Sequence, residues 1–402
     1  MIIHIAIPAM NEAEFISRTM HALESQIVTA DMRVYVCVNQ PENYWEDVEK
    51  QFICEDNQKT LELLKQFGGL NLEILDFCSR GKGWGTKKFG VGIARKVLMD
   101  HISTVANKED IVISLDADTF VNESYVQSVI DNLTKFPNAV AVSVPYYHPL
   151  TDSDAEDRAI LRYEIYMRNY AIQMLAIDSP FAFTALGSAM AYRMSAYRAI
   201  GGMSPMKSGE DFYFLQQMRK FGPLLISNPE MVYPAARFSD RVFFGTGPAM
   251  IKGDAGDWNS YPIYHHSQFQ EVRKLYDAVP DLMDANFEMD SVFYRFLQTQ
   301  FKEDRFLDPI RKNSKDAKQF SRGFYTKVDG LRVLQFLKSA HATSEMSDRE
   351  LLVDNFPQLK EIDVKYSKED QLVDFSTEDL ASIRNILFDV ENQLIMNKII
   401  LT

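Results

Sequence analysis

Two aspartates separated by one residue, Asp116 and Asp118, are the clearest candidates for chemistry in this chain. They follow the run Asp110–Leu115 (DIVISL), which predicts a buried strand. Carboxylates at the carboxyl end of a parallel strand face the crevice where such sheets bind ligands. Their spacing suits Mg²⁺ or Mn²⁺, because hard cations prefer oxygen ligands and share them with substrate phosphates. Acidic residues also follow strands as turn formers or N-caps, and that interpretation stays open for Asp118.

A second acidic pair, Glu210 and Asp211, stands at the start of a predicted helix, Glu210–Phe221. An acidic residue there is favoured by the helix dipole and needs no further role. The functional alternative is a general base, because a carboxylate near an acceptor can take its hydroxyl proton. Spacing alone favours the structural interpretation.

Arginine and glycine occur together in the run Arg237–Gly247, which also contains Arg241. Arginine binds phosphate oxygens bidentately, and glycines permit a loop to close over a ligand. A solvated basic turn is an equally good interpretation of this run.

The elements that must position these residues alternate between strand and helix along the first half of the chain. Strands are expected at 2–8, 33–38, 72–77, 110–115 and 139–145, and helices at 11–26, 55–67, 89–101 and 122–136. This alternation predicts an α/β fold with a mostly parallel sheet flanked by helices. A helix at 156–176, an interrupted strand at 183–192 and the helix at 210–221 follow.

A change of character near residue 264 suggests a second domain. Glycine almost disappears there, and helical patterns with charged faces take over. With 402 residues, the chain is long enough to form two domains of ordinary size. We therefore expect a catalytic domain at 1–265 and a mainly helical C-terminal region at 266–402.

Composition limits the partners and the compartment. The net charge of −13 argues against nucleic acid as a partner. The three cysteines form no disulfide or zinc pattern, which suits a reducing cytoplasm. No apolar run reaches the roughly 18–20 residues needed to cross a bilayer. We expect a cytoplasmic protein, which would meet any lipid-borne substrate at the membrane surface.

The motifs occur in a characteristic order: Pro8-Ala9-Met10-Asn11-Glu12, Ala94-Arg95-Lys96, Asp116-Ala117-Asp118, Gly187-Ser188, Gly201-Gly202 and Gly209-Glu210-Asp211. Over residues 1–250 this order resembles the family-2 glycosyltransferases of the GT-A fold. The resemblance implies a nucleotide-diphosphate sugar as donor, an acceptor hydroxyl and a divalent metal.

The resemblance also implies roles for individual residues. Pro8, Ala9, Asn11 and Glu12 would frame the nucleobase, with Met10 replacing the usual aromatic residue. Asn39 stands where the family has an acidic residue that contacts the base or ribose, which leaves the nucleotide open. Arg95 would face the base or diphosphate, and Arg241 would lie in a mobile loop that could close over the diphosphate.

The same resemblance implies the metal and the base. Asp116 and Asp118 match the Asp-x-Asp motif, and either His265 or His266 would supply a third metal ligand. Asp211 matches the base of inverting members, with Glu210 as its companion.

The predicted function is therefore metal-assisted, inverting glycosyl transfer in polysaccharide or glycoconjugate synthesis. A retaining mechanism stays open. Two alternatives remain: a sugar-phosphate nucleotidyltransferase, and a non-catalytic glycan- or partner-binding module on the same scaffold. The first is disfavoured because residues 9–12 replace the expected glycine-rich basic loop.

Overall fold

The computed structural model describes residues 1–86, 89–207, 209–239, 245–359 and 365–401. They form two compact units. The first comprises residues 1–160, 183–256 and 398–402, and the second comprises 161–182 and 257–397. The units therefore differ from the consecutive segments 1–265 and 266–402, because the helix α5 (Asp154–Ala176) runs from one unit into the other and the chain returns to the first unit at its end.

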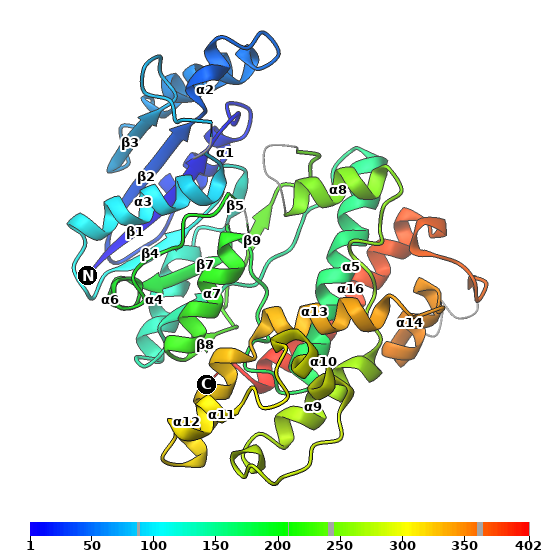
Figure 1. Cartoon of the computed structure of the whole chain (residues 1–402). Helices are drawn as coiled ribbons and strands as arrows, with labels where there is room; N and C mark the ends of the chain where they lie inside the picture. The colour runs from blue at the N-terminus through cyan, green and yellow to red at the C-terminus, as the bar shows by residue number, and fades with distance from the viewer. Residues whose placement is uncertain (87–88, 208, 240–244, 360–364, 402) are drawn as a thin grey trace. The chain divides into compact units, whose positions relative to one another are not determined.

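An eight-stranded sheet forms the core of the first unit, in the order β10-β8-β6-β7-β4-β1-β2-β3 (Figure 1). Six strands run in one direction, and β7 and β10 run against them. The strands are β1 (Ile2–Ala9), β2 (Asp31–Asn39), β3 (Leu72–Phe77), β4 (Ile111–Ser114), β6 (Ala141–Ser143), β7 (Met190–Arg193), β8 (Leu224–Leu225) and β10 (Ile400–Leu401). A separate pair joins β5 (Thr119–Val121) to β9 (Val232–Pro234).

Helices cover the sheet of the first unit. α3 (Val91–Val105) packs on β1 and β2, and its path across β1 is visible in Figure 1. The other helices of this unit are α1 (Ile16–Glu24), α2 (Gln51–Leu64), α4 (Tyr125–Lys135), α6 (Met194–Ala199), α7 (Glu210–Phe221) and α8 (Thr246–Asp254), of which α2, α4, α6 and α7 contact strands of the sheet. Because helices cover the sheet, the central strand β1 is buried from Ile3 to Ala9, and the one polar side chain in this stretch, His4, lies 3.3 Å from Asp110 Oδ2.

The second unit is helical among the residues that the structure describes. It contains most of α5 and the helices α9 (His266–Asp277), α10 (Val292–Phe301), α11 (Asp308–Lys312), α12 (Ala317–Lys327), α13 (Gly330–His341), α14 (Asp348–Asn355) and α16 (Thr377–Asn397). Apolar residues of α5, α14 and α16 share one core cluster, which includes Leu161, Leu352 and Ile383. The predicted α/β class with a helical C-terminal region is confirmed.

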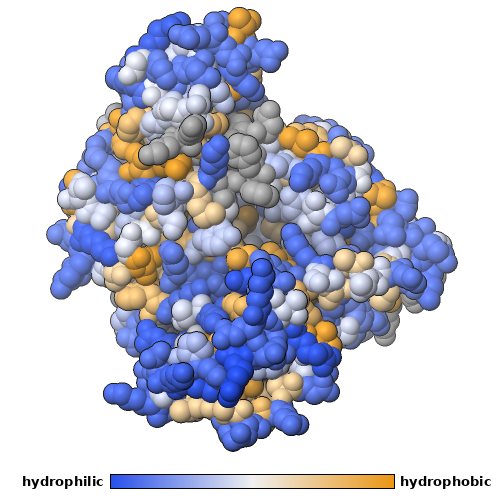
Figure 2. All heavy atoms as spheres, in the orientation of Figure 1, coloured by the Kyte–Doolittle hydropathy of each residue, from blue (hydrophilic) through white to orange (hydrophobic). Residues whose placement is uncertain are grey.

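Among the described residues, no helix combines the length and the apolar character needed to cross a bilayer. The face drawn in Figure 2 is largely hydrophilic, with apolar residues in small groups.

Candidate active site

Arg95 on α3 is the centre of a buried ion cluster in the first unit. Its guanidinium donates to Glu210 and to Asp116 through its two terminal nitrogens. Its Nε donates to the Ser114 hydroxyl at 3.2 Å. Arg95 and Glu210 are 3% and 2% exposed, so this pair is shielded from water, whereas the side chain of Asp116 is 35% exposed. The arginine thus links the end of β4 to the start of α7.

The space for the Arg95 guanidinium depends on a glycine. A Cβ built on Gly187 would overlap the guanidinium carbon and both terminal nitrogens. Because those nitrogens are fixed by Asp116 and Glu210, the side chain could not move aside without breaking an ion pair. Gly187 is therefore required by the close approach rather than by its backbone angles.

Asp211 lies beside this cluster in the first turn of α7. The helix begins after Gly209, whose φ of 73° is left-handed and favours glycine. Burial, reinforced by the negative charges of Glu210 and Asp116, raises the pKa of Asp211 to about 7, although Arg95 acts in the opposite direction. A carboxyl with this pKa exchanges its proton near neutral pH.

Asp118 belongs to a second ion cluster, centred on Arg237. The guanidinium of Arg237 donates to Asp118 Oδ2 from Nε at 2.9 Å and from Nη2 at 2.5 Å. It also donates to Glu12 Oε2 at 2.7 Å, and it lies 4.1 Å from the centre of the Phe15 ring. Burial alone would lower the pKa of Arg237, but the charges of Asp118 and Glu12 raise it. Arg237 therefore stays a cation between two carboxylates.

A network of buried amides holds the loop after β1. Asn11, whose φ is 59°, donates its main-chain N–H to Asn57 Oδ1 at 2.9 Å. Asn57 donates to the Asn39 carbonyl at 3.2 Å. The amide nitrogen of Asn39 in turn donates to the Ala9 carbonyl at 3.0 Å. Asn39 is 3% exposed, so the structure gives it a role in positioning this loop.

Most of the predicted site residues lie in the first unit. These are Pro8, Ala9, Asn11, Glu12, Asn39, Arg95, Asp116, Asp118, Glu210 and Asp211. Arg241 lies outside the described residues. His265 and His266 belong to the second unit. Among the described residues, these two histidines and Asp354 form a group that could hold a metal ion. Neither Asp116 nor Asp118 belongs to that group.

The sequence assigned no role to several residues that support the site, among them Gly187, which was named only in the order of motifs. Ser114 accepts a hydrogen bond from Arg95, and the missing side chain of Gly187 leaves space for the Arg95 guanidinium. Phe15 packs against Arg237. Asn57 could have been found, because it lies four residues from the apolar Ile53 and Leu61 and therefore on the buried face of its helix. A polar residue on such a face needs a buried partner.

Five carboxylates belong to these two clusters or lie beside them: Glu12, Asp116, Asp118, Glu210 and Asp211. The bases in these contacts are Arg95 and Arg237, which bind Asp116 through Oδ1 and Asp118 through Oδ2. Carboxylate oxygens are the kind of ligand that Mg²⁺ and Mn²⁺ prefer. Among the described residues, however, no group of three metal-capable side chains forms around Asp116 and Asp118.

Comparison with solved structures shows a distant similarity between the main-chain path of this protein and those of other proteins. No protein-family model matches the sequence, and no curated protein matches it. S. aureus TarS 1–349, solved with UDP-GlcNAc, is 14% identical, with 90% of this chain and 89% of that chain covered and a TM-score of 0.40. The mannosyltransferase PcManGT from Pyrobaculum calidifontis, solved with GDP-Man and Mn²⁺, is 13% identical, with 98% and 87% covered and a TM-score of 0.39. These values are too low to assign an activity or a residue role.

Proposed function

We propose that this chain is a GT-A glycosyltransferase related to family 2, which transfers a sugar from a nucleotide-diphosphate donor to an acceptor hydroxyl. The observation that carries the proposal is the environment of Asp211. This carboxyl has a pKa of about 7 and interacts electrostatically with Asp116, the first residue of the Asp-x-Asp pair. A base and a cation-binding pair in one site are the parts that such a transfer needs.

In this proposal, Asp211 takes the proton from the acceptor hydroxyl. The acceptor oxygen forms a bond to the anomeric carbon while the bond from that carbon to the diphosphate breaks. Attack from the face opposite the leaving group inverts the anomeric configuration. A pKa near 7 lets Asp211 accept the proton at neutral pH and release it again after transfer.

Asp116 and Asp118 would hold Mg²⁺ or Mn²⁺. When bound, the ion supplies Lewis-acid stabilisation of charge on the departing diphosphate. Arg95 keeps Asp116 and Glu210 in place, and Arg237 does the same for Asp118 and Glu12. The loop Pro8–Glu12, fixed through Asn39 and Asn57, would contact the nucleotide.

The test is transfer by the Asp211→Asn variant, which keeps the shape of the side chain and removes its basicity. Donors including UDP-GlcNAc and GDP-Man are incubated with Mn²⁺ and a set of glycosides and polyols, and glycosylated product is measured. We expect Asp211→Asn to lower kcat by at least about 100-fold, because general bases contribute on this scale. Nucleotide affinity should change little.

The matched control is Asp131→Asn, at an exposed position on α4. It should retain the wild-type rate. In the wild type, kcat should fall as the pH is lowered through about 7, because protonated Asp211 cannot accept a proton. Wild-type transfer by Asp211→Asn would remove Asp211 from the base role.

A further inference from the structure

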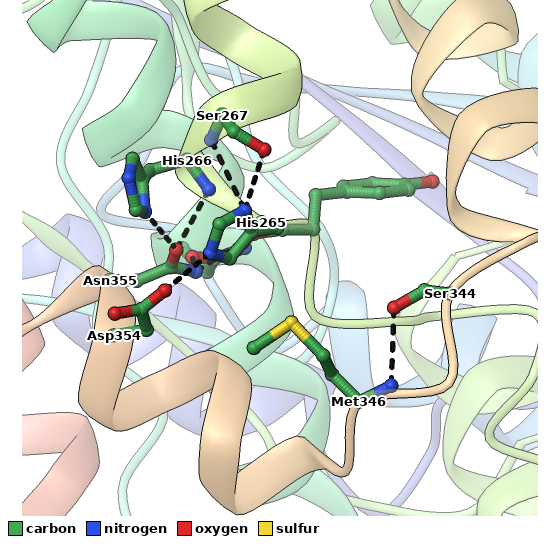
Figure 3. Close-up of polar contacts among 9 residues, drawn as sticks. His265, His266, Ser267, Ser344, Met346, Asp354 and Asn355 are labelled. Atoms are coloured by element: carbon green, nitrogen blue, oxygen red, sulfur yellow. Dashed lines mark hydrogen bonds and ion pairs between the residues drawn. The ribbon is translucent and has the colours of Figure 1, made fainter.

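Two histidines and an aspartate form a compact group within the second unit (Figure 3). His265 immediately precedes α9, and His266 is its first residue. Asp354 and Asn355 are the last two residues of α14. One ligand atom from each of His265, His266 and Asp354 lies within 4.8 Å of the other two.

The contacts of His265 show which ring nitrogen could bind a cation. Its Nδ1 accepts the main-chain N–H of Ser267 at 3.3 Å, so this nitrogen carries no proton. The proton of the neutral ring is therefore on Nε2, which lies 2.6 Å from Asp354 Oδ2. A metal ion can replace this proton, and Ser267 would keep the ring oriented.

The neighbouring Asn355 holds His266 in position. Its Oδ1 accepts the main-chain N–H of His266 at 2.8 Å and lies 3.3 Å from the Nδ1 of that ring. Its amide nitrogen donates to Asn169 Oδ1 at 3.0 Å and to the Tyr264 carbonyl at 2.8 Å. Asn169 is fully buried on α5 and donates to the same carbonyl at 3.1 Å. The group is thus held by hydrogen bonds that reach the buried Asn169 and the carbonyl of Tyr264.

We propose that His265, His266 and Asp354 form a binding site for a transition-metal ion such as Zn²⁺, separate from the Asp-x-Asp pair. Two imidazoles and one carboxylate favour Zn²⁺ over Mg²⁺, which prefers oxygen alone. The ion would join the start of α9 to the end of α14. The three side chains leave a fourth position of a tetrahedral ion open to water, and the site does not depend on the proposed transfer reaction.

The experiment measures Zn²⁺ binding to full-length protein from which any histidine tag and any metal have been removed. Zn²⁺ is titrated against a chromophoric chelator, and Co²⁺ is added separately to record its visible absorption. We expect one Zn²⁺ per chain and a Co²⁺ spectrum of the intense, tetrahedral kind. His266→Gln and Asp354→Asn should each weaken Zn²⁺ binding by at least about tenfold, on the scale seen when metal sites lose supporting groups. His266 is the preferred histidine to change, because the side chain of His265 also caps α9.

Two controls separate this site from the others. His21→Asn changes a histidine that is 70% exposed on α1 in the first unit, and Asp118→Asn removes a carboxylate of the proposed catalytic pair. Both should bind Zn²⁺ like the wild type, and all variants are checked for native circular dichroism. Equal Zn²⁺ affinity in Asp354→Asn, His266→Gln and the wild type would overturn the proposal. Loss of Zn²⁺ binding in Asp118→Asn would also overturn it, because the ion would then belong to the first unit.

Discussion

Glu210 and Asp211 are neighbours in sequence with different surroundings. Glu210 is 2% exposed and is held by the Arg95 guanidinium. Asp211 has no such ion pair among its described contacts, and burial and nearby negative charge raise its pKa to about 7. Adjacent carboxyls in contrasting environments are typical of sites where one group positions and the other exchanges a proton.

The raised pKa of Asp211 predicts that this residue destabilises the protein at neutral pH. A carboxyl that binds its proton more tightly when folded favours the native state at low pH, and this advantage is lost as the pH rises from about 4 to about 7. Asp211→Asn, which is neutral at every pH, should increase the free energy of unfolding by about 1–2 kcal/mol above pH 7. Urea unfolding of both proteins at pH 5 and pH 8 measures the difference. A gain that is larger at pH 5 would contradict this explanation.

Local sequence patterns indicated which carboxylates to consider for the candidate site, but they did not indicate the ion pairs that hold those carboxylates. Two carboxylates after a strand and a carboxylate at a helix start are local patterns. The ion pairs of Arg95 join residues that are 21 and 115 positions away in the chain. No local pattern indicates which distant partner an arginine selects. Likewise, no local pattern indicates whether His265 or His266 lies near enough to the Asp-x-Asp pair to share a metal ion with it.

At the scale of elements, some bounds were predicted correctly, but the shortest strands were not predicted. The strand at 72–77 and the helix at 210–221 have the predicted bounds. The expected strand at 183–192 is reduced to β7, Met190–Arg193, because the Gly187 region passes close to Arg95 instead of joining the sheet. β5, β8, β9 and β10 have two or three residues each, too few to show a period.

The approach of the Gly187 segment to α3 gives a test at this scale. Gly187→Ala places a methyl group on the Arg95 guanidinium and must displace it from Asp116 or Glu210. We expect a loss of about 2–4 kcal/mol in the free energy of unfolding, as for other disrupted buried ion pairs, and transfer activity should fall with it. The control is Gly68→Ala, since nothing lies within 4 Å of a Cβ at Gly68. Equal stability of the two variants would show that the Arg95 cluster tolerates the added methyl group.

At the scale of the whole molecule, the chain enters and leaves its units in a way that the sequence did not reveal. Residues 161–182 belong to the second unit although the first continues after them. After α16, the chain returns to the first unit, where Ile400 pairs with Leu225 and Leu401 with Leu224. A change in composition marks the helical region well, but it cannot mark a strand of two residues.

The return of β10 predicts that Leu401 contributes to the stability of the first unit. Leu401 is fully buried, and its removal leaves a cavity beside β8. Leu401→Ala should lower the free energy of unfolding by about 2–3 kcal/mol. Met396→Ala, at a position that is 77% exposed, is the control and should have little effect. If both variants unfold at the wild-type urea concentration, the pairing of β10 with β8 is not a stabilising part of the fold.

The most direct test of the proposed function is calorimetric titration of the protein with a panel of nucleotide-diphosphate sugars. Each titration is made with and without Mn²⁺, on the wild type and on Asp118→Asn. We predict that the wild type binds one nucleotide class in the presence of Mn²⁺. Omission of the ion, or the Asp118→Asn change, should weaken that binding by at least about tenfold, because the diphosphate loses its cation bridge. Absence of binding to every donor, or binding that neither change affects, would contradict the proposal that this chain is a metal-assisted glycosyltransferase.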